Sequence, residues 1–250
     1  MAQFMANWKN ELFKLRKRKK YFVFLILGSL ICVASALRLV IANYITGGAL
    51  SPETVLGGLA NANLPFFLLV FLPLMAIMAT CDLFAGEQAD HTIRFSFMRP
   101  VGKGKIFFSK AAAVFTLCAF DLAVLYLVTT LTQVILGGGT RGVASSLLAC
   151  LLDLIPLAVL VLFFCLVNQV VKGSSLTVLL CVVLYVGFIA VGTYLPAFGG
   201  LLFAGYLRWH NLWIGVTLPF LSMLSRIGLL AGYGLVFACG GYLLFDRKEA

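Results

Sequence analysis

Long apolar runs alternate with short polar stretches along this chain of 250 residues. A helix needs about 20 apolar residues to cross the hydrocarbon core of a bilayer, since each residue adds about 1.5 Å. Runs long enough for this occupy residues 21–44, 64–81, 111–136, 147–171, 176–194 and 221–245. The pattern therefore predicts an all-α integral membrane protein with about six transmembrane helices, folded as a single transmembrane domain over residues 1–250.

One more apolar stretch, residues 196–215, competes for the membrane but differs in character. It is rich in glycine, and Arg208, His210 and Asn211 lie near its middle. Polar and charged side chains are costly at the centre of a spanning helix. We therefore expect residues 195–220 to form a re-entrant or interfacial segment at the outer side of the membrane.

The first 20 residues are too polar to enter the hydrocarbon, yet their apolar positions recur at helical spacing. Within about 100° of one another on a helical wheel lie Met1, Phe4, Met5, Trp8, Leu12 and Leu15. Such a helix is typical of the membrane interface, where the basic residues that follow it meet anionic headgroups. The residues expected to contact lipid are Trp8, Lys17, Arg18, Lys19 and Lys20.

Composition narrows the class of protein further. Hydrophobic residues make up 62% of the chain and charged residues only 11%, with a mean hydropathy of +1.05, which excludes a water-soluble domain. The net charge of +10 comes from basic residues that flank apolar runs, which favours a membrane surface over nucleic acid as the partner. The seven cysteines include no CxxC pair, so neither a disulfide framework nor a zinc site is expected.

The distribution of lysine and arginine predicts the orientation, because cytoplasmic loops carry the excess of positive charge. If the amino terminus lies in the cytoplasm, every basic residue falls on the cytoplasmic side except Arg38, Arg141, Arg208 and Arg226. We therefore expect a multi-pass protein of the plasma membrane with both termini in the cytoplasm.

Only one predicted loop is both long and rich in polar residues, the connection of residues 82–110 between the second and third predicted helices. It resembles a segment of ABC-2 type permeases, the membrane subunits of ABC exporters, which reads E-x-x-x-G-T, a short apolar stretch, R-P-V, a basic position and a final K. The matching positions are Glu87, Thr92, Ile93, Arg94, Arg99, Pro100, Val101, Lys103, Lys105, Ile106 and Lys110. One position departs from the family pattern, since His91 replaces a glycine and removes its backbone freedom.

The resemblance implies that this chain works with a separate ATPase subunit. The loop would form a coupling helix that docks on that subunit, with Glu87, Asp90, Thr92, Arg94, Arg99 and Pro100 as coupling residues. The partner would bind ATP and Mg²⁺, so this chain would hold no cofactor and would not itself be an enzyme. A second copy or a homologous permease would complete a dimer that exports an amphiphilic substrate, such as a drug, an antimicrobial peptide or a lipid-like molecule.

Other functions stay open at this point. The sequence lacks the GxxxxGK[ST] motif of an ATP-binding loop and the HExxH motif of a metalloenzyme, which makes a membrane-embedded enzyme of lipid metabolism a minor alternative. A secondary transporter or channel would use charges buried in the membrane, and the candidates are Arg38, Asp121, Asp153 and Arg226. These residues could instead include a structural ion pair of Asp153 with Arg226 or Arg38, and Asp121 is expected near the midplane.

Overall fold

The computed structural model describes residues 2–48, 50–89, 102–171, 173–195, 199–213 and 219–247. These residues are helical nearly throughout, and none of them forms a strand. In chain order the elements are α1 (Ala2–Lys17), α2 (Lys19–Ile45), α3 (Pro52–Leu56), α4 (Leu59–Phe66), η1 (Phe67–Phe71), α5 (Leu72–Cys81), η2 (Asp82–Gly86), α6 (Glu87–Ala89), α8 (Lys103–Ile135), α9 (Val143–Val170), α10 (Ser174–Tyr194), η3 (Phe203–Tyr206), η4 (Trp209–Leu212) and α12 (Phe220–Asp246).

Among the described residues, six helical segments are long and apolar enough to cross a membrane, which confirms the predicted transmembrane helices. They span Lys19–Ile45, Pro52–Ala89, Lys103–Ile135, Val143–Val170, Ser174–Tyr194 and Leu221–Asp246. The second segment differs most from its predicted range of 64–81, since it extends over 38 residues. Hydropathy marked only its apolar middle, and the more polar residues at both ends are helical as well.

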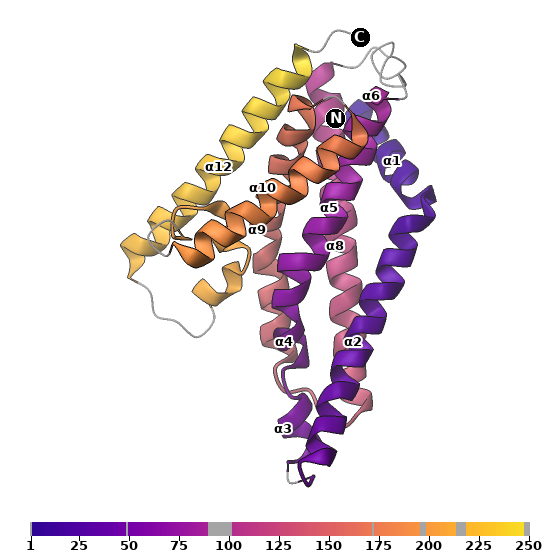
Figure 1. Cartoon of the computed structure of the whole chain (residues 1–250), viewed down its shortest axis with the longest axis vertical. Helices are drawn as coiled ribbons and strands as arrows, with labels where there is room; N and C mark the ends of the chain where they lie inside the picture. The colour runs from indigo at the N-terminus through magenta and orange to yellow at the C-terminus, as the bar shows by residue number, and fades with distance from the viewer. Residues whose placement is uncertain are drawn as a thin grey trace.

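Three helices form the centre of the bundle, and three others lie around them (Figure 1). The segments built on α5 and α9 are the most buried, followed by α8, whereas α2, α10 and α12 expose most of their apolar side chains. Helices α10 and α12 tilt away from the long axis, on the side of the bundle opposite to α2 (Figure 1). In a bilayer these exposed apolar faces are suited to contact lipid.

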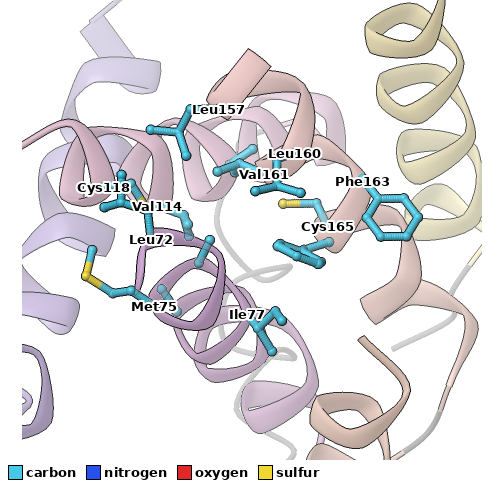
Figure 2. Close-up of a cluster of buried hydrophobic side chains, with 14 of the residues drawn as sticks. Leu72, Met75, Ile77, Val114, Cys118, Leu157, Leu160, Val161, Phe163 and Cys165 are labelled. Atoms are coloured by element: carbon cyan, nitrogen blue, oxygen red, sulfur yellow. The ribbon is translucent and has the colours of Figure 1, made fainter. Parts of the chain in front are cut away.

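The core between the central helices is packed from small and large apolar side chains. Figure 2 shows Leu72, Met75 and Ile77 of α5 facing residues of α8 and α9. The labelled partners are Val114, Cys118, Leu157, Leu160, Val161, Phe163 and Cys165. Six of the seven cysteines are buried and all seven are free thiols, as expected of residues that pack as small hydrophobic groups.

Helix α5 depends on a hydrogen bond from α10. Pro73 has no N–H, so the carbonyl of Leu69, four residues earlier, lacks the donor that an α-helix would supply. The chain forms a π-helical turn, η1, at this position, and the hydroxyl of Tyr185 in α10 donates to the Leu69 oxygen over 2.7 Å. Because an unpaired carbonyl costs several kcal/mol in hydrocarbon, Tyr185 ties α10 to α5.

The predicted outer segment is compact in its described part, residues 199–213. It contains two short 3-10 helices, η3, which contacts α9, α10 and α12, and η4, which packs against α9. Phe203 anchors it, with ring centroids 5.0 Å from Phe163 of α9, 5.5 Å from Phe188 of α10 and 5.3 Å from Phe237 of α12. No spanning helix occurs within residues 199–213, whereas residues 196–198 and 214–218 lie outside the described part.

Both ends of the chain gather at one end of the bundle, here called the terminal end. Lys105, near the start of α8, donates to Gln3 of α1 over 3.2 Å, and Lys103 donates to the Asp246 carbonyl of α12 over 2.6 Å. The short helix α6 lies at this same end (Figure 1). A chain that crosses the membrane an even number of times has its first and last helices at the same end of the bundle.

Candidate functional site

The candidate site lies at the terminal end, where the polar helix α1 packs along the first turns of α8. Asn7 donates to the Ser109 hydroxyl over 3.1 Å, and the Trp8 indole donates to the Thr116 hydroxyl over 3.2 Å. Helix α1 is separated from α2 by Arg18 alone, whose extended backbone ends one helix and allows the next to start in a new direction. Leu15 of α1 is also fully buried in the core, so polar and apolar contacts together hold this helix against the bundle.

Four charged side chains meet between α1, α6 and α8, and we call them the charge cluster: Glu11, Lys14, Glu87 and Lys110. Lys110 is fully buried, and its ammonium group contacts Glu87 Oε2 at 2.7 Å and Glu11 Oε2 at 3.2 Å. Lys14 contacts the other oxygen of each carboxylate, Oε1, at 2.9 Å in both cases. Each carboxylate thus has two cationic partners, and the cluster as a whole is neutral.

The π-helical turn η2 completes the bonding of Lys110. An ammonium group has three N–H donors, and the third of them reaches the carbonyl of Leu83 over 3.1 Å. Leu83 lies in η2, where the wider turn shifts the regular ladder of backbone hydrogen bonds. The buried ammonium group therefore has an acceptor for every donor, which is the condition under which a buried charge is tolerated.

Lys14 lies outside the membrane-spanning helices, and its pKa depends on both carboxylates of the charge cluster. Burial alone lowers its pKa, but hydrogen bonds and charge attraction from Glu87 and Glu11 outweigh burial and raise the pKa above the ordinary value for lysine. Its side chain is 40% exposed, whereas that of Glu11 is 3% exposed. Lys14 therefore stays protonated and closes the cluster on its solvent side.

A second group of charges fixes the junction of α1 and α2 to the same end. Asp82 of η2 contacts Arg18 Nη1 at 2.9 Å and Lys20 Nζ at 2.6 Å, and it accepts a hydrogen bond of 2.5 Å from the Tyr21 hydroxyl. Arg18 and Lys20, expected to contact lipid, thus have a carboxylate partner within the protein. Lys17 and Lys19 are exposed, and the Lys17 ammonium lies 4.6 Å from the centroid of the Phe13 ring.

The predicted coupling residues divide into two groups. Glu87 is 9% exposed and bonded within the charge cluster, so its carboxylate does not lie on an open docking surface as the sequence suggested. Asp90, Thr92, Arg94, Arg99 and Pro100 lie outside the described residues, and their role in coupling stays a prediction. The motif nevertheless has a structural meaning here, because its first residue, Glu87, pairs with its last residue, Lys110.

The predicted intramembrane charges are not assembled as expected. Asp153 of α9 is fully buried, but its partner is His210 of η4 and neither Arg226 nor Arg38. One carboxylate oxygen accepts the His210 backbone N–H over 2.8 Å, and the other lies 2.5 Å from the Nδ1 atom of the ring. Neither Arg38 nor Arg226 forms an ion pair with Asp153 among the described residues, so the proposed ion pair is wrong for the described structure. Asp121 is buried near the middle of α8.

Sequence reasoning missed Glu11, Lys14 and Asp82 as partners, and it did not connect His210 with Asp153. One signal was available in α1, since Asn7, Glu11 and Leu15 recur at a spacing of four residues and share one face. That face is the one buried against α8. For His210 the sequence held no comparable pattern, because η4 is only four residues long. Among the described residues, no group of three or more potential ligands is gathered to hold a metal.

Comparison with protein families supplies the wider context of this geometry. A family profile described as ABC-2 family transporter protein matches residues 8–190, from α1 into α10. The chain belongs to the ABC-2 family. A search of curated proteins finds no significant match. In this ABC-2 transporter protein the charge cluster lies wholly inside the matched region, whereas His210 and α12 lie beyond it.

Proposed function

We propose that this chain is the membrane-spanning permease subunit of an ATP-driven exporter and that a separate ATPase docks on the segment between α6 and α8. The main observation in support is that Glu87 and Lys110, the first and last residues of the family motif, contact each other at 2.7 Å. A ligand bound to the segment would therefore act on α1, α6 and α8 together, because all three helices contribute to the charge cluster. Membership of the ABC-2 family supports the same function.

The docking surface proper would be residues 90–99, with Asp90, Arg94 and Arg99 as charged contacts. Mixed acidic and basic side chains fix the register of an interface. Glu87 then has a different role from these residues, since it anchors the segment to the protein. This division refines the sequence-based assignment, in which Glu87 was itself a docking contact.

The remaining parts of the proposal follow from the family and the composition. ATP and Mg²⁺ would be bound by the ATPase partner, and a second copy of this chain or a homologous permease would complete the membrane part. The protein would lie in the plasma membrane with the terminal end in the cytoplasm, as the excess of basic residues there supports. Its substrate would be amphiphilic, such as a drug, an antimicrobial peptide or a lipid-like molecule, leaving the cell.

Charge reversal of the docking surface tests this function. The double variant Arg94→Glu/Arg99→Glu should insert and fold normally, but it should bind the ATPase less tightly and lose transport. A central contact contributes about 2 kcal/mol or more, so affinity for the ATPase should fall by roughly thirtyfold. Co-purification of the ATPase and substrate-stimulated ATP hydrolysis are the measurements.

The matched control replaces Lys17 and Lys19 with glutamine, because both are exposed and equally charged but lie on α1 and α2. These changes should weaken the association with anionic lipid and leave ATPase binding intact. If the Arg94/Arg99 variant binds the ATPase as well as the wild-type protein does, or if the purified permease recruits no ATPase from its own cell, the proposed function is wrong.

A further inference from the structure

Asp121 is a buried carboxyl group near the middle of α8, within a helix that is 33 residues long. Its level in the bundle follows from the packing of α2 against α8. Gly28 lies so close to Leu125 that a Cβ atom on Gly28 would be 2.8 Å from the leucine side chain, and the Thr129 hydroxyl donates to Cys32 Sγ over 3.1 Å. In both contacts the residue of α8 lies 97 positions after its partner in α2. The same offset places Phe24 of α2 beside Asp121 of α8.

Apolar layers lie on both sides of Asp121 along α8. One turn earlier, Cys118 packs with Leu72 and Met75 of α5, as Figure 2 shows. One turn later, Leu125 packs with Cys32, Phe67 and Phe71. Asp121 is only 2% exposed, so its side chain lies within the packed interface of α8 with α2 and α5.

The carboxyl group also lacks the partners that the other buried acids have. Its Oδ2 atom is buried without a hydrogen-bond partner, and no ion pair of Asp121 forms among the described residues. Glu11 and Glu87, by contrast, each have two lysine partners, and Asp153 has His210. An ionised carboxylate without partners in a low-dielectric site is so costly that the group takes up a proton instead.

Neighbouring titratable groups do not supply a counter-charge. Cys118, one turn before on α8, interacts with the Asp121 carboxyl group, and Tyr21 of α2 interacts with Cys118 but donates to Asp82. Helices α4 and α5 carry no charged residue. The charged residues of the other elements packed against α8 bond elsewhere or lie toward helix ends. They are Lys9, Glu11, Lys14, Arg16 and Lys17 of α1, Lys19, Lys20 and Arg38 of α2, Asp153 of α9, and Arg226 and Asp246 of α12.

We propose that Asp121 is a proton-binding site. It is a neutral carboxylic acid while α2, α5 and α8 are packed together, and it ionises only when these helices separate and admit water. In that step the O–H bond breaks, the proton passes to a water molecule, and the electron pair stays on the carboxylate. The inference needs only that the chain spans a membrane, so it does not rest on the proposed export function.

A consequence for the conformational equilibrium follows from proton binding. The packed state holds one proton at Asp121 that the separated state releases, so acid favours the packed state and alkali favours the separated state. The variant Asp121→Asn, which has the shape of the neutral acid and cannot ionise, should lose this dependence on pH.

Infrared spectroscopy of the full chain in lipid tests the proposal directly. The wild-type protein at neutral pH should show the C=O stretching band of a protonated carboxyl group, and deuterium oxide should shift this band slowly because the site is buried. Labelling aspartate with ¹³C should shift the band too, whereas labelling glutamate should not. Asp121→Asn should abolish the band, and the control Asp153→Asn should retain it, because the Asp153 carboxylate is paired with His210.

Two results would overturn the proposal. The first is the absence of a protonated aspartate band in the labelled wild-type protein at neutral pH, a measurement that needs no variant to fold. The second is a band that survives in Asp121→Asn or disappears in Asp153→Asn, since it would then belong to another residue.

Discussion

The charge cluster and the Asp153–His210 pair both bury ionisable groups, yet they differ in construction. In the cluster, two carboxylates and two ammonium groups alternate, and each charge contacts both opposite charges. In the pair, one carboxylate is bound by His210 through the imidazole ring and the backbone N–H. Both attach a short or polar element, since α1 is polar, α6 has three residues and η4 has four. Apolar contacts contribute as well, through Leu15 of α1 and Trp209 of η4, so buried charge supplements the small apolar area that such elements can bury.

The largest effect should come from removing one cation of the cluster. Lys110→Met leaves Glu11 and Glu87 buried with one partner in place of two, and breaking a buried ion pair in this way typically costs about 3–5 kcal/mol. Thermal unfolding of the purified chain in detergent measures the loss. Lys105→Met on the same helix is the matched control and should cost less than about 1 kcal/mol. Equal stability of the two variants would mean that the cluster does not form.

A smaller effect is expected at the other site. Asp153→Leu removes the carboxylate that contacts both the backbone N–H and the ring of His210, and hydrogen bonds to charged groups contribute about 1.5–3 kcal/mol. Adding His210→Leu should cost little more, whereas adding Arg226→Leu should give an additive change, because Arg226 is not the partner. A double-mutant cycle on thermal stability distinguishes these outcomes. If the cycle shows an interaction energy between Asp153 and Arg226 and none between Asp153 and His210, the ion pair predicted from the sequence is correct.

A neutral hydrogen bond provides a reference for both charged sites. Tyr185→Phe deletes the donor to the Leu69 carbonyl and should cost about 1–3 kcal/mol, because the carbonyl is left buried without a partner. In a Pro73→Ala background the new backbone N–H can reach the same carbonyl, so the cost of Tyr185→Phe should shrink. An unchanged cost in that background would show that the hydroxyl acts elsewhere.

The smallest effect concerns pH. The pKa of Lys14 is raised in the folded state, so its contribution to stability is complete below the unfolded value of about 10.5 and is lost as the pH rises through the folded value. Thermal stability should therefore fall on the alkaline side of that range, and Lys14→Gln should flatten this part of the profile. A stability profile that Lys14→Gln leaves unchanged would exclude Lys14 as the cause of the alkaline loss.

Sequence patterns predicted the six spanning helices because each helix carries an apolar run. The length of that run is enough to place the helix in the membrane. They also placed Glu87 and Lys110 in one motif, although not in contact. The partners that were missed come from elements without such a run. His210 lies in a glycine-rich stretch with no periodic pattern, and Glu11 faces inward from a helix whose apolar side had been assigned to lipid. Hydropathy therefore predicts which segments enter the membrane, but it does not predict which polar side chains meet there.

The bond between Tyr185 and Leu69 has a consequence for synthesis of the chain. Leu69 enters the membrane early, but its hydroxyl partner is made 116 residues later. Until α10 is inserted, the second spanning segment carries a carbonyl group that lipid cannot satisfy. The amino-terminal half is therefore incomplete as an assembly intermediate, and release from the insertion machinery before α10 arrives would leave it exposed to quality control.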